Sequence, residues 1–421
     1  MKVLLVGGGG REHALAWALS RSPLVDQLLT APGNPGTASV SERHSVSVDD
    51  LEGLVELAKD EEVELVVVGP EAPLVGGLAD LLIKEGIRVF GPTAKAAQLE
   101  GSKAFAKRLM AARGIPTAAS REFDSPEEAV GYVRDRGAPL VVKADGIAAG
   151  KGVIVCDSVQ QAEEAIRAAL TEGRFGESGS RILIEDRLEG NELSVLAFCD
   201  GTNVLTMEAA RDFKRALDGD RGPNTGGMGS YSPVPECDPE LLDRVTDEIL
   251  HPIAHALKAE AGPYVGVIYA GLILTSDGPK VIEFNCRFGD PEAQALIPRL
   301  DSDLAEPILA CVEGNIADTK LAWKPQTCVT VVLTSEGYPG SYQTGYVIEG
   351  IDEAERLTGL PVFHSGTKFG PSQEVLSGGG RVLSVCALGD DQRQAAARAY
   401  EAAEQVSFAG KTMRTDIANT K

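Results

Sequence analysis

The stretch KVLLVGGGGREHALAWALSR at residues 2–21 places a short apolar run before a glycine turn, and a helix-like segment follows the turn. In that segment Leu15, Ala18 and Leu19 lie on one stripe, as in an amphipathic helix. Strand-like runs with Gly- or Pro-rich ends continue to alternate with helical patterns, at residues 27–31, 51–59, 64–68, 74–84 and 87–90. This alternation predicts a doubly wound parallel sheet, which binds ligands along the carboxyl edge of its strands.

The rest of the chain mixes helical and strand-like segments without an internal repeat. We expect long helices at 93–113 and 239–260, and a small αβ segment at about 122–188 that is compact enough to be a lid. A boundary is expected at Pro325. The sequence therefore predicts a multidomain protein of α/β and α+β type, with an N-terminal, a central and a C-terminal domain at 1–102, 103–325 and 326–421.

The composition excludes several classes of partner. The chain has 421 residues, and its 62 acidic and 40 basic residues give a formal charge of −22. Nucleic acids and anionic lipids are bound mainly by Lys and Arg, so neither partner is expected. The seven cysteines are scattered without a C-x-x-C pair, no apolar run approaches the ~20 residues of a membrane span, and the first apolar run is too short for a signal peptide. These features predict a cytoplasmic protein.

The first glycine turn does not match a dinucleotide-binding fingerprint. Gly7-x-Gly9 is followed by Glu12 where a third small residue is required. The second strand ends in Thr30-Ala31-Pro32 and supplies no acid for a ribose hydroxyl. Two readings stay open, a turn that holds an anion with its backbone N–H groups and an ordinary tight connection.

A second glycine-rich stretch, KADGIAAGKG at 143–152, resembles a phosphate-binding loop without matching the P-loop pattern. Lys151 is followed by Gly instead of Ser or Thr, and VIVC after the loop reads as a strand. The stretch is therefore expected to be a hairpin that could fold over a triphosphate. A buried Lys143 needs an anionic partner, which could be a phosphate or a protein carboxylate, while Lys151 could also be a solvated loop tip.

The segment VIEFNCRFGDPE at 281–292 carries the strongest chemical signal. Side chains alternate along a strand, so Glu283, Asn285 and Arg287 project from the face opposite the apolar residues. Carboxylate and amide oxygens suit Mg²⁺, and an adjacent arginine suits a carboxylate or phosphate. The alternative reading is the polar face of a half-buried sheet. His251 and His255 lack a third ligand and are expected to be packing or surface residues.

Taken together, the motifs resemble the phosphoribosylamine–glycine ligase (glycinamide ribonucleotide synthetase) family of the ATP-grasp superfamily. The resemblance spans essentially the whole chain and rests on VGGGGREHALAW, APGNPGT, VGPEAPLVGGLAD, FGPT, AAQLEGSKAFAK, VVKADGIAAGKGVIV, GPNTGGMGSYSP and VIEFNCRFGDPE. It implies an ATP-grasp central domain with a mobile lid. It also implies the ligation of glycine to 5-phosphoribosylamine, with ATP converted to ADP and phosphate through a glycyl phosphate.

The resemblance also implies roles for individual residues. Expected metal ligands for Mg²⁺ or Mn²⁺ are Glu283 and Asn285. Expected ATP-binding residues are Lys103, Lys143, Gly150, Lys151, Gly152, Glu185, Leu188 and Glu192. Glycine or its acyl phosphate is assigned to Arg287, Lys214 and Asp212, and phosphoribosylamine to Gly9, Gly10, Arg11, Asn34, Gly36, Pro70, Glu71 and Asp290. We expect a monomer acting on small molecules.

The chain departs from the family pattern at two positions. Phe213 stands where many members have His, and Gly8 stands where Asn or Ser is more usual. Three other functions are weighed against the ligase: another ATP-grasp ligase, such as a carboxylase acting on biotin or on a purine-pathway intermediate; a nicotinamide oxidoreductase; and a nucleotide sensor without turnover. The motifs GPNTGGMGSYSP and EFNCRFGDPE disfavour another ATP-grasp ligase. The broken dinucleotide fingerprint disfavours the oxidoreductase, and the complete set of metal and phosphate residues disfavours the sensor.

Overall fold

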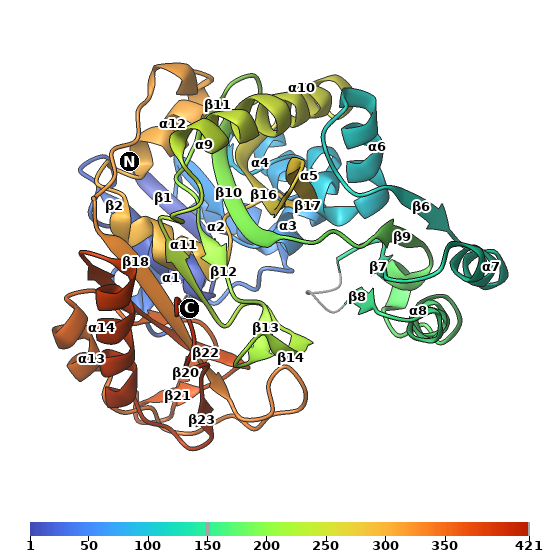
Figure 1. Cartoon of the computed structure of the whole chain (residues 1–421). Coiled ribbons are helices and arrows are strands. Elements are labelled where there is room, and N and C mark those ends of the chain that lie inside the picture. The colour runs from blue at the N-terminus through green and yellow to red at the C-terminus, as the bar shows by residue number, and fades with distance from the viewer. Residues whose placement is uncertain (148–151, 420–421) are drawn as a thin grey trace.

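A computed structural model describes residues 1–147 and 152–419. The N-terminal region forms a five-stranded parallel sheet of order β3-β2-β1-β4-β5, which confirms the predicted doubly wound sheet (Figure 1). Its strands are β1 (Lys2–Gly7), β2 (Gln27–Pro32), β3 (Glu42–Arg43), β4 (Leu65–Val68) and β5 (Arg88–Phe90). Its helices are α1 (Gly10–Leu19), α2 (Leu51–Asp60), α3 (Glu71–Gly76) and α4 (Leu78–Lys84). The strand order changes direction between β1 and β4, and the turns that lead to Arg11 and Glu71 flank that point.

Two helices that the sequence predicts as continuous are each broken once. The helix expected at 74–84 divides into α3 and α4 at Gly77, whose φ of 95° is a left-handed conformation that favours glycine. The helix expected at 93–113 divides at Ser102 into α5 (Ala94–Gly101) and α6 (Lys103–Arg113). Ser102 is extended, and its hydroxyl accepts a hydrogen bond from the Phe105 N–H, so it caps the second helix.

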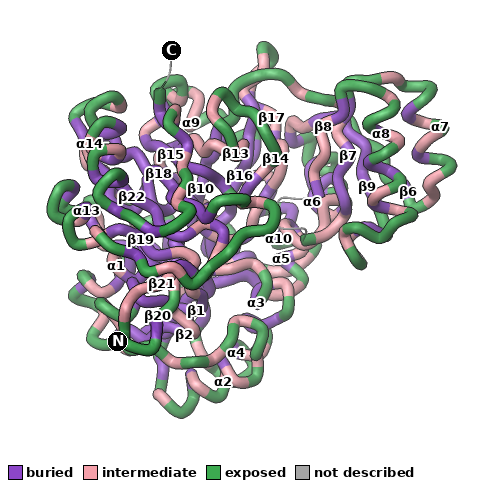
Figure 2. Tube along the Cα trace, turned by 90° about the horizontal axis from the view of Figure 1, so that it is seen from below, coloured by how far each residue is buried: buried purple, intermediate pink, exposed green. Residues whose placement is uncertain are grey.

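A small subdomain projects from one side of the molecule (Figure 1). It is an antiparallel sheet of order β6-β9-β7-β8 covered by two helices. Its elements are β6 (Ser120–Phe123), α7 (Pro126–Arg136), β7 (Leu140–Ala144), β8 (Val153–Cys156), α8 (Val159–Ile166) and β9 (Ile182–Asp186). Its apolar core, which includes Phe123, Val142 and Ile166, is separate from those of the main body (Figure 2).

The central sheet has the order β11-β10-β16-β17 and is antiparallel. Its strands are β10 (Asn191–Asp200), β11 (Val204–Thr206), β16 (Val265–Thr275) and β17 (Gly278–Asn285). The helix expected at 239–260 is continuous and contains a π-helical turn at Thr246–Leu250, between α9 (Pro239–Val245) and α10 (His251–Glu260). Two further helices follow the sheet, α11 (Glu292–Leu296) and α12 (Ala305–Glu313).

The last sheet joins strands that lie more than a hundred residues apart in the chain. Its order is β12-β15-β18-β22-β19, and β23 pairs with β18. The strands are β12 (Arg211–Asp212), β15 (Gly229–Ser232), β18 (Thr327–Ser335), β19 (Phe363–His364), β22 (Arg381–Gly389) and β23 (Lys411–Thr412). Two-stranded pieces are formed by β13 (Arg215–Leu217) with β14 (Arg221–Asn224) and by β20 (Thr367–Phe369) with β21 (Val375–Ser377), and the helices are α13 (Ile351–Thr358) and α14 (Gln392–Gln405).

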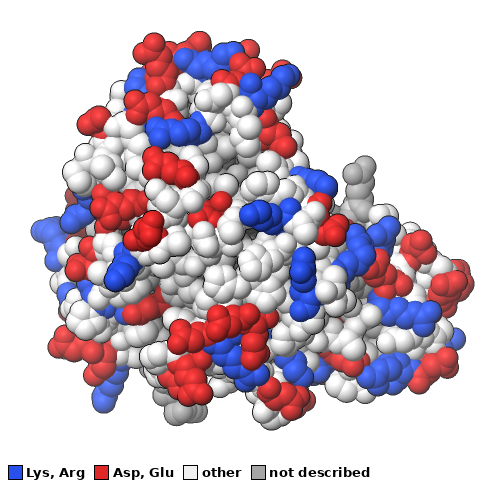
Figure 3. All heavy atoms as spheres, turned by 90° about the horizontal axis from the view of Figure 1, so that it is seen from above, with Lys and Arg blue, Asp and Glu red and all other residues white. Residues whose placement is uncertain are grey.

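The face seen in Figure 3 carries acidic and basic side chains interspersed. All seven cysteines are free thiols, and six of them are buried. In the part of the chain that the structure describes, no helix has the length and apolar character needed to cross a membrane.

Two buried histidines join the N-terminal sheet region to the last sheet. The His364 N–H donates to Nδ1 of His13 at 2.9 Å, and the two rings lie 5.5 Å apart. Burial lowers the pKa of His13 to about 3, helped by His364, and lowers the pKa of His364 to about 4. Both rings are therefore neutral in the folded protein at neutral pH.

This pair is expected to make the folded state sensitive to acid. An unfolded histidine has a pKa of 6.5, so below that value the unfolded state binds more protons than the folded state. The free energy of unfolding should fall as the pH drops from about 6.5 toward 4, by about 2 kcal/mol per histidine at pH 5. Urea unfolding at pH 7.5 and 5.0 measures this loss of stability.

The double variant His13→Gln/His364→Gln should show a smaller pH dependence of stability than the wild type, whereas the control His255→Gln, at an exposed position, should not. The same pH dependence in the wild type, the double variant and the control would contradict the assignment to His13 and His364.

Candidate functional site

A cleft of about 490 Å³ lies where the projecting subdomain, the central sheet and the N-terminal and last sheets meet. Most of the residues predicted from the sequence line it: Arg11, Glu71, Lys103, Lys143, Gly152, Glu185, Asp212, Lys214, Glu283, Asn285, Arg287 and Asp290. Outside the lining lie Gly9, Gly10, Asn34, Gly36, Pro70, Leu188 and Glu192. Gly150 and Lys151 are outside the described residues. The volume is that of a typical small-molecule site.

One end of the cleft is lined by three lysines, Lys103, Lys107 and Lys143. Lys143 on β7 and Lys107 on α6 both contact Glu185 Oε2 on β9, at 3.0 and 3.3 Å. Glu185 Oε1 is buried and has no hydrogen-bond partner among the described residues. Two cations thus share one carboxylate, which leaves net positive charge beside the cleft. Lys143 therefore has the protein carboxylate that the sequence left open as an alternative to a phosphate, and both readings fit this arrangement.

A bulge in β17 holds Lys143 from the other side. Gly271 of β16 pairs with Glu283, but the next residue, Leu272, pairs with Val281, so Ile282 is the extra residue. The Ile282 carbonyl is thereby free to accept a hydrogen bond from Lys143 Nζ at 2.9 Å. The bulge joins the projecting subdomain to the strand that carries Glu283.

Lys103 opens helix α6 at the break behind Ser102. Its Nζ donates to the Gly146 carbonyl of the glycine-rich stretch at 2.8 Å, and burial lowers its pKa. Lys107, one helical turn later on the same face, was not predicted, although the four-residue spacing from Lys103 is a signal that could have indicated it. Asp145 fixes the same junction by accepting hydrogen bonds from the Ser102 hydroxyl and the Ala104 N–H, each at 3.1 Å.

Glu283 and Asn285 project from β17 into the cleft. Burial opposes ionisation of Glu283, but nearby cations outweigh it and lower the pKa of its carboxyl group, chiefly those of Lys214, Lys143 and Lys103. The described residues contain no cluster of three or more His, Cys, Asp or Glu side chains that could enclose a metal. One carboxylate and one amide fit a hard cation that takes its remaining ligands from phosphate oxygens and water, as Mg²⁺ does.

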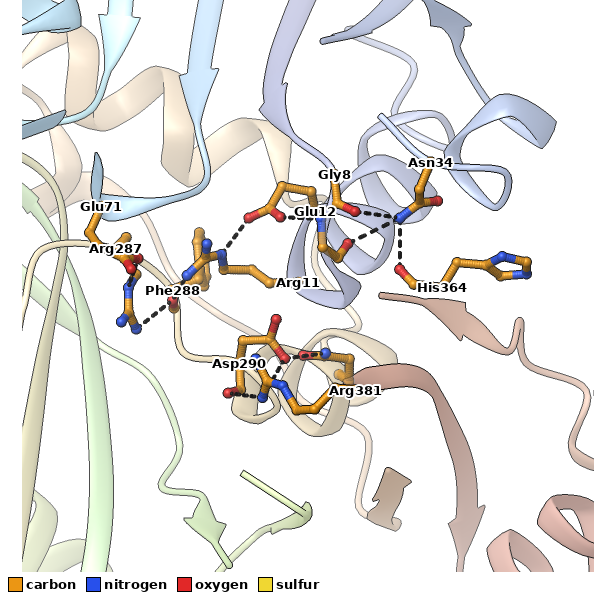
Figure 4. Close-up of polar contacts among 12 residues, drawn as sticks. Gly8, Arg11, Glu12, Asn34, Glu71, Arg287, Phe288, Asp290, His364 and Arg381 are labelled. Carbon is orange, nitrogen blue, oxygen red and sulfur yellow. Dashed lines mark hydrogen bonds and ion pairs between the residues drawn. The ribbon is translucent and has the colours of Figure 1, made fainter. Parts of the chain in front are cut away.

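Arg287 is held by two carboxylates. Its Nε donates to Glu71 at 3.1 Å (Figure 4), and its Nη2 donates to Glu100 at 2.8 Å. Although burial opposes the charged form, these two acids raise the pKa of Arg287. Glu100 also accepts the Cys286 N–H at 2.8 Å. Glu100 was missed by sequence reasoning because its partners are 186 and 187 positions away.

Arg11 and Arg287 meet at the backbone carbonyl of Phe288, to which their guanidinium groups donate at 3.0 and 3.3 Å (Figure 4). On the same wall Asp290 pairs with Arg381 of β22 at 3.3 Å. Arg381, which was also not predicted, donates to the Gly226 and Asp290 carbonyls as well. Three arginines therefore lie along this end of the cleft, a set suited to an anionic ligand.

Lys214 lies among acids between β12 and β13. Its Nζ is 2.8 Å from Asp212 Oδ2 and 3.6 Å from Glu192 Oε2. Burial alone would lower its pKa, but Asp212 and its other anionic neighbours raise it well above the ordinary value. Close to Lys214 in the cleft lining, Tyr269 donates to Glu292 at 2.8 Å, and neither residue was predicted.

The predicted residues of the N-terminal turns have protein partners. The Asn34 amide donates to the carbonyls of Gly8 and His364, at 3.0 and 2.7 Å (Figure 4). Gly36 packs so closely that a Cβ there would lie 2.2 Å from the His13 ring. Gly9, Gly10 and Pro70 form the starts of helices α1 and α3. Their substrate-binding roles stay predictions.

Comparisons with known proteins identify the family. The models of the phosphoribosylglycinamide synthetase N domain, ATP-grasp (A) domain and C domain match residues 1–100, 101–293 and 328–420. The chain is 48% identical over 417 residues to the phosphoribosylamine–glycine ligase of Brucella melitensis biotype 1, covering 99% of this chain and 97% of the relative. It is 49% identical over 420 residues to that of Allochromatium vinosum, covering 99% and 98%. A crystal structure of the Thermotoga maritima phosphoribosylamine–glycine ligase has a TM-score of 0.86 and 32% identity, covering 99% of this chain and 100% of that one. The chain therefore belongs to the phosphoribosylglycinamide synthetase family, whose members are named phosphoribosylamine–glycine ligases.

Proposed function

We propose that the protein joins glycine to 5-phosphoribosylamine and converts ATP to ADP and phosphate. The glycine carboxylate attacks the γ-phosphorus, ADP leaves, and the resulting glycyl phosphate is attacked by the amine of phosphoribosylamine, which releases phosphate and a proton. The observation that carries this proposal is the cleft itself. It combines a lysine-lined end, an acid–amide pair on β17 and an arginine-lined end in one cavity.

The charges suit this reaction. A carboxylate must approach a triphosphate, so cations have to neutralise the repulsion between two anions. We assign the phosphates of ATP to Lys103 and Lys143, with Lys107 as an added contact, and the adenine and ribose side to the strand exit from Glu185 to Glu192. Positioning and charge stabilisation then dominate over covalent work by the protein.

A divalent cation is proposed at Glu283 and Asn285, either Mg²⁺ or Mn²⁺. When bound, it would neutralise phosphate charge. The lowered pKa of Glu283 keeps its carboxylate ionised at neutral pH and therefore able to act as a ligand.

Arg287, Lys214 and Asp212 are proposed to hold glycine. Arg287 would bind its carboxylate, and Asp212 would bind its ammonium group beside Lys214. The arginine-lined end, with Arg11 and Asp290, is assigned to phosphoribosylamine.

Closure of the projecting subdomain at about 122–188 would keep water from the acyl phosphate and from phosphoribosylamine, which both hydrolyse. The protein is proposed to act as a monomer. The free thiols support the proposed cytoplasmic location.

The test is ADP release by purified protein with Mg²⁺, ATP and freshly generated phosphoribosylamine, with and without glycine. Release that requires both substrates is expected. Release in the absence of both, or none despite ATP binding, would overturn the proposal. Substituting bicarbonate or another carboxylate for glycine tests the alternative function, another ATP-grasp carboxylate–amine ligase of purine metabolism.

Glu100→Gln is expected to lower kcat/KM for glycine by about 10- to 100-fold, because small displacements of a substrate-binding group have effects of this size. The variant keeps the size of the side chain but removes the charge that, with Glu71, fixes Arg287. Steady-state kinetics with varied glycine measures the effect, and exposed Glu306→Gln on α12 is the control. Unchanged glycine kinetics in a folded Glu100→Gln protein would show that Glu71 suffices.

A further inference from the structure

The hairpin of β13 and β14 connects two parts of the cleft lining. Lys214 precedes β13, and Asn224, Thr225 and Gly226 stand at the end of β14, all in the lining. The Thr225 N–H and hydroxyl both donate to the Lys214 carbonyl, at 2.8 and 2.9 Å. The two ends of the hairpin are therefore tied together at the cleft, so a movement of the hairpin would move both.

The turn of this hairpin is held by three consecutive residues near the C-terminus, Arg414, Thr415 and Asp416. We call these three residues the C-terminal clamp. Arg414 Nη1 donates to the Arg215 carbonyl at 3.0 Å and to Asp220 Oδ1 at 2.8 Å. The Thr415 N–H and hydroxyl donate to the two oxygens of Asp218. Asp416 Oδ2 accepts the Gly219 N–H at 2.8 Å. The contacts span 194 to 199 positions of sequence.

Arg414 is the centre of the clamp. Its side chain is 1% exposed, and its guanidinium also donates to both oxygens of Asp416 at 2.7 Å. Burial favours neutral Asp416, but the hydrogen bonds from Arg414 and Gly219 lower its pKa to about 2. A buried guanidinium requires such partners, and breaking one is costly.

The same guanidinium lies over the ring of Phe213, 5.1 Å from its centroid. Phe213 is the residue between Asp212 and Lys214. The clamp therefore contacts the site strand directly as well as through the hairpin. Its own place is fixed by α14, because Tyr400 Oη donates to the Arg414 carbonyl at 2.9 Å and accepts the Ile417 N–H at 2.9 Å.

We infer that the C-terminal clamp positions Lys214 and Asn224–Gly226 in the cleft. It thereby affects glycine binding, although the clamp itself lies outside the cleft. The clamp residues are positioning residues, because none of them lines the cleft. The expected effect on glycine kinetics rests on the proposed function, since that function assigns Lys214 and Asp212 to glycine. The phosphate-side lysines lie on α6 and β7, which the clamp does not contact, so ATP binding should be spared.

The test uses two variants of the full-length protein. Arg414→Gln removes the buried charge and the contact with Phe213. Asp218→Asn/Thr415→Val weakens only the contacts at the hairpin turn and leaves Arg414 in place, so it is the variant more certain to fold. Arg356→Gln, an exposed arginine on α13 with a 72% accessible side chain, is the matched control.

Both variants should raise the KM for glycine, by about 10- to 100-fold for Arg414→Gln, while the KM for ATP changes less than about twofold. Hydrogen exchange at the amides of residues 213–225 should accelerate in both and stay unchanged in Arg356→Gln. The hydrogen-exchange measurement does not require an active enzyme. If the wild-type protein lacks glycine-dependent ADP release, the proposed function fails, but hydrogen exchange still tests whether the clamp holds the hairpin.

Two outcomes would overturn the inference. One is unchanged hydrogen exchange at residues 213–225 in both variants, because the clamp then does not hold the hairpin. The other, in an active wild-type background, is faster exchange with the KM values for glycine and ATP unchanged or raised equally, because the clamp then serves stability alone.

Discussion

Glu283→Gln is expected to lower kcat by about 10²–10³-fold, the loss typical of removing one preorganised electrostatic group from an active site. The amide matches the carboxylate in size but carries no charge to hold a divalent cation. The fold should survive, because three neighbouring cations keep acidic partners: Lys143 keeps Glu185, Lys214 keeps Asp212, and Arg287 keeps Glu71 and Glu100. Lys103 keeps its hydrogen bond to the Gly146 carbonyl. Glycine-dependent ADP release at saturating substrates measures the change.

The control for this variant lies on the same strand. Lys280 pairs with Asp277 and does not line the cleft, so Lys280→Ala should leave kcat within about twofold, as expected of a substitution away from the site. Raising the Mg²⁺ or Mn²⁺ concentration should restore part of the activity of Glu283→Gln if the loss comes from weak metal binding. A folded Glu283→Gln protein with a near-normal rate would remove the metal assignment.

Lys143→Met is expected to weaken ATP binding by about 1.5–3 kcal/mol, or roughly 10- to 100-fold in Kd, the worth of one hydrogen bond to a charged group. Its Nζ is fixed by Glu185 and the Ile282 carbonyl before any ligand arrives, so little ordering is needed on binding. Calorimetric titration with ATP measures the loss.

A fall in stability should accompany this change and must be separated from it. Glu185 retains Lys107 at 3.3 Å, so the carboxylate is not left without a cation. Thermal unfolding of the apoprotein gives the stability term, and exposed Lys95→Met on α5 is the control for loss of one positive charge. An unchanged Kd for ATP in Lys143→Met would leave the lysine with a purely structural role.

The sequence predicted what is local and periodic. The parallel sheet of the first hundred residues follows from apolar runs that end in glycine or proline turns, and β17 with Glu283 and Asn285 follows from alternation along one strand. Family resemblance supplied the reaction, because the residues alone left Lys143 open between a phosphate and a carboxylate.

What the sequence could not supply depends on tertiary contacts. Glu100 looks like an ordinary helical acid until the fold places it against Arg287, and Arg381 lies on a strand whose neighbours come from distant segments. The break at Gly77 depends on a positive φ, and the bulge at Ile282 on the register between β16 and β17. A pattern of residue types carries none of these quantities.

The interruption at Ser102 has a consequence for how this chain can vary. Glu100, in the last turn of α5, faces Arg287, whereas Lys103 begins α6 and faces Gly146, so two positions three residues apart serve opposite ends of the cleft. One residue inserted between them would displace Glu100 from Arg287 or Lys103 from Gly146, because both contacts depend on the length of the connection at Ser102. The linker from 100 to 103 therefore acts as a spacer of fixed length, and in this enzyme insertions and deletions are expected to be tolerated in surface loops but not there.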